Sequence, residues 1–526
     1  MTTPLTRLSV RLIHRGFLIV LVLVSGLSAV VVIQYQHTFP EPADAASLQV
    51  LAQNPAIRVL FGVPMALDNA GGFTVWRTGT FAAVTLASWA FLAATRITRG
   101  EEQSGRWALL LIGQHRPPWV VAHHFLVLLG AQLLMGSALA LALIVAGAGT
   151  QGALIYGLGV TLVGMLFAAV GTLCAQLVDE RRTASGIAAA VLGLALLLRM
   201  VADGVESLAW LAWLTPFGLL AEASPYVANR LGPLVMMAVM VAAVGGLAIF
   251  TTAHRDIGSG LMAGSGTRPA RYGLLRSIPG FAIRRVLPSA FGWAAGLCAY
   301  FLVIGLLARS LTEFLIANPR FAELAAQAGF AGLATVQGYA AALFALLAIP
   351  LGVFAASRLS VDAADEASGR LAAVFSRPLP RSRWALVQIA VLIAAVVGLA
   401  LAGGVATVIG TALAGANLRL AEALAGALNV VPVAVLCLGA AQVAIGWAPE
   451  AVLALGAAPA VGGFLLTVLV DTFDGPNWLA QLSPFAHLAS VPATAPDWAG
   501  AAGMIGVSVL LAGLGIAGFA RRDLRG

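Results

Sequence analysis

Long apolar runs alternate with short polar connections along almost the whole chain. Each run approaches the roughly 20 residues that a helix needs to cross the hydrocarbon core of a bilayer. The runs are rich in Ala, Leu, Val and Gly and lack the alternation of a barrel strand, so the pattern predicts helices. The predicted spans are 16–35, 78–95, 119–147, 153–177, 184–201 and 232–251, then 289–308, 335–356, 384–415, 424–446, 450–470 and 498–518. These runs predict an all-α polytopic membrane protein with about twelve transmembrane helices.

Composition agrees with this class and removes the soluble alternatives. Hydrophobic residues make up 60% of the 526 residues and charged residues 10%, with a formal net charge of +8. In a soluble chain that excess would suggest nucleic acid, but here the basic residues, all arginine, sort by side of the predicted membrane. With the N-terminus inside, most arginines fall in cytoplasmic segments. We therefore expect a multi-pass protein of the plasma (inner) membrane, with both termini cytoplasmic and no nucleic-acid partner.

Short motifs recur at nearly constant spacing and divide the chain into two halves. Because six predicted spans separate equivalent points, the halves are expected to be parallel repeats related by an axis along the membrane normal. The expected domains are a first six-helix half (1–251), a cytoplasmic linker with a second elbow helix (252–288) and a second six-helix half (289–526). The recurring motifs are Glu101–Arg106 with Asp365–Arg370, Leu214–Phe217 with Leu482–Phe485, and His254–Ile257 with Arg521–Leu524.

Each half opens with a basic amphipathic stretch. Arg7, Arg11 and Arg15 follow one another at intervals of four and make one stripe, with leucines on a neighbouring arc. Arg276, Arg284 and Arg285 precede the first span of the second half. Such a pattern predicts an elbow helix in the headgroup layer, and simple positive-inside anchoring explains it equally well.

A charged patch follows the second span of each half. Glu102 with Arg106 and Glu366 with Arg370 have the i, i+4 spacing of helical ion pairs, and the leading carboxylates suit a helix N-terminus. Prolines soon afterwards end the predicted helix. Two interpretations stay open: a salt-paired helix without a partner, or a docking surface used twice.

The order of these motifs resembles that in permeases of type 2 ABC exporters. The E-E-x-S-G-R patch, the following proline, the L-[TS]-P-F segment and the closing R-D-[IL] carry this resemblance. A fused two-half chain is similar to the polyketide-antibiotic (tetronasin-type) exporter permeases of bacteria. The resemblance implies export of amphipathic or hydrophobic compounds by a permease that is not an enzyme and has no cofactor of its own. ATP and Mg would be bound by a separate ATP-binding subunit, present as two copies.

The resemblance also implies roles for individual residues. The loop after the second span would be a coupling helix received by the ATPase, the loop after the fourth span a second contact, and the first, second and fifth helices the wall of a substrate cavity. Short helices would dip into the membrane at Glu206–Tyr226 and Thr472–Ala495. The aromatic cavity residues are equally explained as packing or lipid-facing side chains. The residues are, for coupling, Glu101, Glu102, Gly105, Arg106, Asp365, Glu366, Gly369 and Arg370; for the second contact, Glu180, Arg181 and Glu450; and for the cavity, Phe81, Trp89, Phe91, Phe344 and Phe354.

Two other classes compete with this interpretation. An ion-coupled secondary multidrug antiporter would also have twelve helices in parallel halves, but it needs ionisable residues at membrane depth, and all 22 acids fall in loops or at span edges. A membrane-embedded enzyme needs a nucleophile, base or metal cluster. The best candidate pair, His123 and His124, points about 100° apart on a helix, so no metal site is predicted.

Overall fold

The computed structural model describes residues 3–38, 58–59, 62–112, 116–262, 273–319, 332–376, 378–472 and 475–523. Twelve helices in this part of the chain are long and apolar enough to cross a membrane, and the described residues contain no strand. The predicted all-α, multi-pass architecture is confirmed. The candidate spans are Leu5–His37, Ala70–Gln103, Pro117–Val145, Thr150–Leu177, Arg181–Gly204, Gly232–Ala253, Ile278–Ala317, Val336–Ala367, Arg381–Leu413, Leu420–Trp447, Pro449–Thr467 and Trp498–Arg521.

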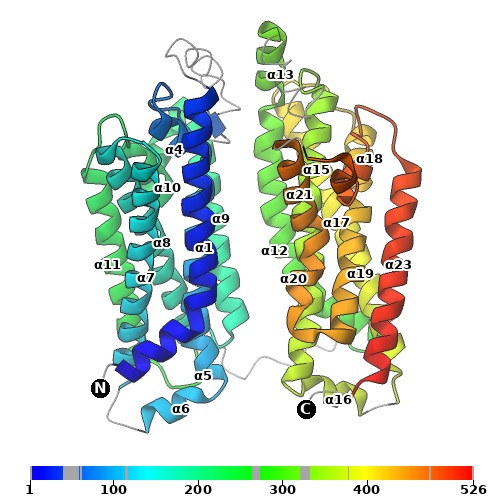
Figure 1. The fold of residues 1–526 in the computed structure, drawn as a ribbon. Coiled ribbons are helices and arrows are strands. Elements are labelled where there is room, and N and C mark those ends of the chain that lie inside the picture. The colour runs from blue at the N-terminus through cyan, green and yellow to red at the C-terminus, as the bar shows by residue number, and fades with distance from the viewer. Residues whose placement is uncertain are drawn as a thin grey trace. The chain divides into compact units, whose positions relative to one another are not determined.

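The chain forms two compact units, Met1–Pro269 (unit 1) and Ala270–Gly526 (unit 2). In unit 1, α8 lies at the centre and packs against α4, α7, α9 and α11 (Figure 1). Its buried residues include Tyr156, Val160 and Phe167. The elements of unit 1 are α1 (Thr3–Thr38), α4 (Ala70–Thr95), η1 (Arg96–Gly100), α5 (Glu101–Gln103), α6 (Arg106–Leu111), α7 (Pro117–Val145), α8 (Thr150–Leu177), α9 (Arg181–Gly204), η2 (Glu206–Leu214), α10 (Pro216–Glu222) and α11 (Gly232–Ala253).

Unit 2 is built around α15 and α19, with α12 packed on α17 and α23 packed on α19. Its fifth span is irregular, because a π-helical turn interrupts it. The elements are α12 (Ile278–Leu306), α13 (Ala308–Ala317), α15 (Val336–Ala367), α16 (Arg370–Phe375), α17 (Arg381–Leu413), α18 (Leu420–Asn429), α19 (Val431–Trp447), η3 (Pro449–Ala451), α20 (Val452–Ala457), η4 (Ala458–Gly462), α21 (Gly463–Thr472), α22 (Asn477–Ala480), η5 (Pro484–His487) and α23 (Trp498–Arg521).

The first elbow is the beginning of α1 rather than a separate helix, and Figure 1 shows α1 bending near its N-terminal end. Arg7, Arg11 and Arg15 are exposed, as the stripe predicts. The opposite face is fixed to α7, where Ser9 Oγ lies 2.9 Å from Nδ1 of His124. The neighbouring His123 pairs with Thr6 in the same way. The two histidines therefore anchor the elbow.

Prolines shape the segment before the sixth span in both units. Thr215 caps α10 by accepting the Gly218 N–H at 3.0 Å, and Ser483 accepts the Phe485 N–H at 3.2 Å. Pro216 and Pro484 then occupy the first helical turn, where a missing N–H costs nothing. A new helical element therefore begins at the proline of each L-[TS]-P-F motif.

Close packing of α7 on α8 depends on a glycine. A Cβ added to Gly136 would lie 1.7 Å from Thr161 Oγ1 and 2.6 Å from the Gly157 carbonyl oxygen. Small residues allow helix backbones to approach in this way inside membranes. Gly130 lies on the same helix with nothing within 4 Å of such a Cβ.

We expect Gly136→Val to force α7 and α8 apart and to lower the unfolding temperature of the purified chain by several degrees, a cost of about 1–3 kcal/mol for overpacking. Gly130→Val is the matched control, because it carries the same change in helix propensity without the clash. Thermal unfolding followed by size-exclusion chromatography measures both. Equal melting of the two variants would contradict the close approach.

Candidate functional site

The charged patch is a helix–turn–helix corner in both units. The acidic residues end a long helix, and the chain then turns through a Ser-Gly pair into α6 or α16. Gly105 (φ 75°) and Gly369 (φ 72°) have left-handed backbone conformations that favour glycine. In unit 2 the prediction that the carboxylates begin a short helix is therefore wrong, since they lie at the C-terminal end of α15. In unit 1 they lie in the three-residue α5, which is continuous with the helix before it and ends the second span.

This turn also changes the ion pairs. Arg106 donates to both carboxylate oxygens of Glu101 at 2.5 and 2.6 Å, five positions earlier, and Arg370 pairs with Asp365 at 3.1 Å. The predicted i, i+4 pairs of Arg106 with Glu102 and of Arg370 with Glu366 are wrong, because a left-handed glycine between the partners breaks the helical spacing. The hydrogen bonds that Arg106 donates to Glu101 raise the pKa of the Arg106 guanidinium, which therefore stays charged.

Glu102 is the centre of a buried ion cluster in unit 1. It accepts two hydrogen bonds from Arg255 at 2.7 Å and one from the Gly258 N–H at 2.7 Å, and it lies 3.1 Å from Arg99. The side chains of Glu102, Arg99 and Arg255 are 1%, 0% and 2% exposed. Arg255 follows α11, so the cluster ties the end of the second span to the end of the sixth.

Unit 2 repeats this connection. Glu366, buried at the end of α15, accepts two hydrogen bonds at 2.5 Å from Arg522, which follows α23. The second arginine differs: Ala363 stands where the repeat spacing would put Arg99, and Arg285 of α12 instead pairs with Asp362 at 2.8 Å and with Asp365 at 2.5 Å. The cluster of unit 2 therefore also joins the first span.

We call the two bidentate pairs, Glu102 with Arg255 and Glu366 with Arg522, the latches. The sequence contained both members of each latch, since the E-E patch and the R-D motif recur at offsets of 264 and 267. Their pairing was missed because the partners are 153 and 156 positions apart. Two charged motifs that recur together were the available signal.

The loop after the fourth span lies beside the corner in unit 1. Gln103 donates to the Asp179 carbonyl at 2.9 Å and accepts from the Arg181 N–H at 3.3 Å. Glu180 is exposed next to them, and Glu450 is exposed on η3 of unit 2. The structure therefore joins the two predicted contact regions in unit 1.

The aromatic residues predicted for a cavity have different environments. Phe91, Phe344 and Phe354 are at most 4% exposed and pack inside their own units. Trp89 is partly buried, with its ring 6.2 Å from that of Phe17, and Phe81 is exposed. Phe344 also lines a pocket in unit 2.

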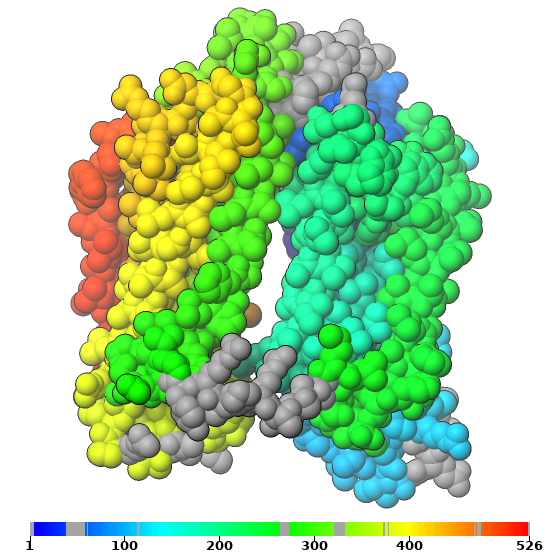
Figure 2. Space-filling view, turned by 180° about the vertical axis from the view of Figure 1, so that it is seen from behind, coloured from blue at the N-terminus to red at the C-terminus, as the bar shows by residue number. Residues whose placement is uncertain are grey.

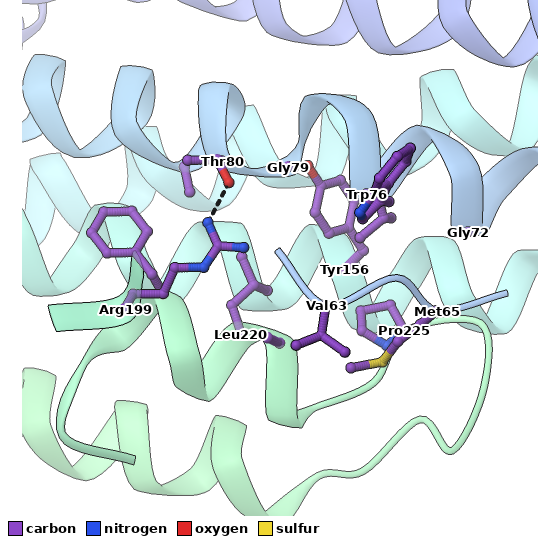
Figure 3. Close-up of a pocket in the computed structure, with 14 residues that line it drawn as sticks. Val63, Met65, Gly72, Trp76, Gly79, Thr80, Tyr156, Arg199, Leu220 and Pro225 are labelled. Atoms are coloured by element: carbon purple, nitrogen blue, oxygen red, sulfur yellow. Dashed lines mark hydrogen bonds between the residues drawn. The ribbon is translucent and has the colours of Figure 1, made fainter. Parts of the chain in front are cut away.

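A second polar centre lies in unit 1 and was not predicted as a pair. Arg199 is buried, forms an ion pair with Asp203 and donates to Thr80 at 2.6 Å (Figure 3). From the sequence, an arginine near the end of the fifth span is explained equally well by snorkelling and by substrate binding, and neither explanation includes Asp203 one helical turn later. An i, i+4 arginine and carboxylate at the end of a span was the available signal.

The described residues define a multi-pass helical membrane protein with a repeated charged corner. They contain no group of three histidine, cysteine or carboxylate side chains that could hold a metal ion. Residues 275–520 match the family model of the C-terminal domain of the multidrug efflux system permease Rv1217c. The chain is also similar to the multidrug efflux system permease protein Rv1217c of Mycobacterium tuberculosis (strain ATCC 25618 / H37Rv), with 29% identity over 517 residues, 96% of this chain and 92% of that protein. The similarity extends across both units.

We expect Glu102→Ala to leave the buried guanidiniums of Arg99 and Arg255 without their carboxylate, and to destabilise unit 1 by about 3–5 kcal/mol. Thermal unfolding of the purified chain measures this loss. Glu313→Ala is the matched control, since Glu313 pairs with Arg309 on the exposed side of α13, where the two side chains are 62% and 57% exposed. The control is expected to melt like the unchanged chain. Equal melting of both variants would show that the cluster does not support the fold.

Proposed function

We propose that this chain is the permease subunit of an ATP-driven ABC exporter, and that α6 and α16 are its contacts with a separate ATP-binding subunit present as two copies. The proposal rests on the helix–turn–helix corner at the charged patch of each unit. Each unit holds a short helix at a fixed turn, outside its candidate spans, and a latch ties that corner to the end of the sixth span.

The surface of α6 supports a protein partner. Trp107 is buried against Leu5, Val120 and Val121 and anchors the helix. Leu109 and the neighbouring Ile112 are 71% and 80% exposed. Figure 2 shows the segment around α6, in light blue, projecting at one end of unit 1. Exposed apolar side chains grouped beside the exposed Arg106 suit a protein interface.

The latches provide a physical route for the transmitted force. A push on α6 acts on α5, where the second span ends. The latch of Glu102 with Arg255 then requires the end of α11 to move with it. In unit 2, Glu366 and Asp365 connect the end of α15 to Arg522 and to Arg285 of α12. ATP would drive transport only through its different affinity for two states of the assembly.

Drug export as the activity is supported by the similarity to a multidrug efflux system permease. The alternative is an ion-coupled antiporter, which needs a carboxylate that gains and loses a proton. The five buried carboxylates of the described residues each have an arginine partner, and protonation would break that ion pair. They are Glu101, Glu102, Asp203, Asp362 and Glu366.

We expect Leu109→Asp to place a charge in the interface with the ATP-binding subunit, and to lower both copurification of that subunit and substrate-stimulated ATP hydrolysis at least about tenfold. Val227→Asp is the matched control, because Val227 is an exposed apolar residue (57%) that precedes α11, at the end of unit 1 opposite to α6. Pull-down with stoichiometry and ATPase assays in nanodiscs measure both variants. A chain that purifies alone and transports with an ion gradient but without ATP would replace this proposal by the antiporter.

A further inference from the structure

Unit 2 contains a pocket between its second, fourth and fifth spans and the segment 485–491, which precedes the sixth span. Its volume is about 200 Å³. Phe344 of α15, Phe464 of α21 and Phe485 of η5 form aromatic walls, and Asn429 and Thr467 add polar groups. None of the residues that line it carries a charge. The volume suits one ring system rather than a whole drug-sized molecule.

A pocket at the corresponding place in unit 1 shows that this cavity belongs to the repeat. The N-caps of α4 and α15, Asn69 and Thr335, differ by 266 positions, and the L-[TS]-P-F motifs differ by 268. At these offsets, residues that line the pocket of unit 1 correspond to residues that line the pocket of unit 2. The corresponding wall residues are Gly72 with Gly338, Val75 with Ala341, Trp76 with Ala342, Gly79 with Ala345, Thr80 with Leu346, Phe217 with Phe485, Leu220 with Leu488 and Ala221 with Ala489.

Large side chains fill the pocket of unit 1. The Trp76 indole donates to the Gly62 carbonyl at 3.0 Å, and Arg199 extends to Thr80 across the space (Figure 3). The remaining volume is about 60 Å³. Unit 2 has Ala342 in place of Trp76 and, at the offset of 268, Thr467 in place of Arg199. The second copy is thus open where the first is closed.

We infer that the pocket of unit 2 is a binding subsite for an uncharged aromatic or aliphatic ring of the transported compound. The inference rests on the proposed export function for its biological role, although the binding itself does not require ATP. Three phenylalanines offer apolar contact and edge-to-face packing to a ring. A charged group would lose its hydration there without an opposite charge among the lining residues.

Photolabelling with benzophenone, a neutral two-ring ketone that inserts into nearby C–H bonds on illumination, tests the binding. The purified full chain in nanodiscs is illuminated with the probe, and modified peptides are mapped by mass spectrometry. We expect labels on the segments 336–346, 426–430 and 485–491. Ala342→Trp, which copies the residue of unit 1, is expected to reduce them at least about tenfold.

Two controls separate filling of the pocket from general effects. Ala502→Trp places the same side chain on an exposed position of α23 and is expected to leave the labelling unchanged. Trp76→Ala, the reverse change in unit 1, should leave the labels in unit 2 unchanged. If Ala342→Trp does not fold, Leu346→Trp is used, since Leu346 lines the pocket and is already 36% exposed.

Labels that stay undiminished in the filled variant, or that miss all three segments, would overturn the subsite. Equal labelling by 4-benzoylbenzoate, the anionic analogue, would overturn the assignment to uncharged groups. The result is independent of the proposed exporter, because no ATP-binding subunit is present. If labelling is intact but ATP-dependent transport fails, the exporter proposal is rejected and the binding subsite is retained.

Discussion

The arrangement of each unit depends on a buried carboxylate at the end of its second span. Glu102 and Glu366 lie where a long helix ends, and each accepts both branches of an arginine fork from the end of the sixth span. A buried carboxylate without a partner would be strongly destabilising, so the two helix ends are held together. The adjoining corner, the loop after the fourth span of unit 1 and Arg285 of unit 2 are positioned around these pairs.

The helical architecture could be predicted from the sequence because length and apolar composition determine what crosses a bilayer. The stripe of Arg7, Arg11 and Arg15 was an equally local feature. Pairing within the corner was predicted incorrectly, because the helical i, i+4 rule ignores a left-handed glycine. The latches and the pair of Arg199 with Asp203 depend on which charged groups become buried, and the pattern of a single segment does not carry that information.

Both units have an ion cluster and a pocket at corresponding positions, but different residues form them. In unit 1 the third member of the ion cluster is Arg99 on the second span, while in unit 2 Arg285 comes from the first span. The same contrast separates the pockets, where Trp76 and Arg199 occupy one copy and small or uncharged residues leave the other open. The connections that hold the helix ends are therefore alike in the two units, while the interiors differ.

The sequence separation of the latches has a consequence for biosynthesis. The Ser-Gly turn joins neighbouring residues and can form as soon as they leave the ribosome, whereas Glu102 must wait for Arg255, 153 positions later. During that interval a carboxylate destined for burial has only Arg99 beside it. The corner of each unit is therefore completed only after the sixth helix of that unit has been inserted. Until then, the end of the second span of unit 1 lacks the two hydrogen bonds that Arg255 supplies.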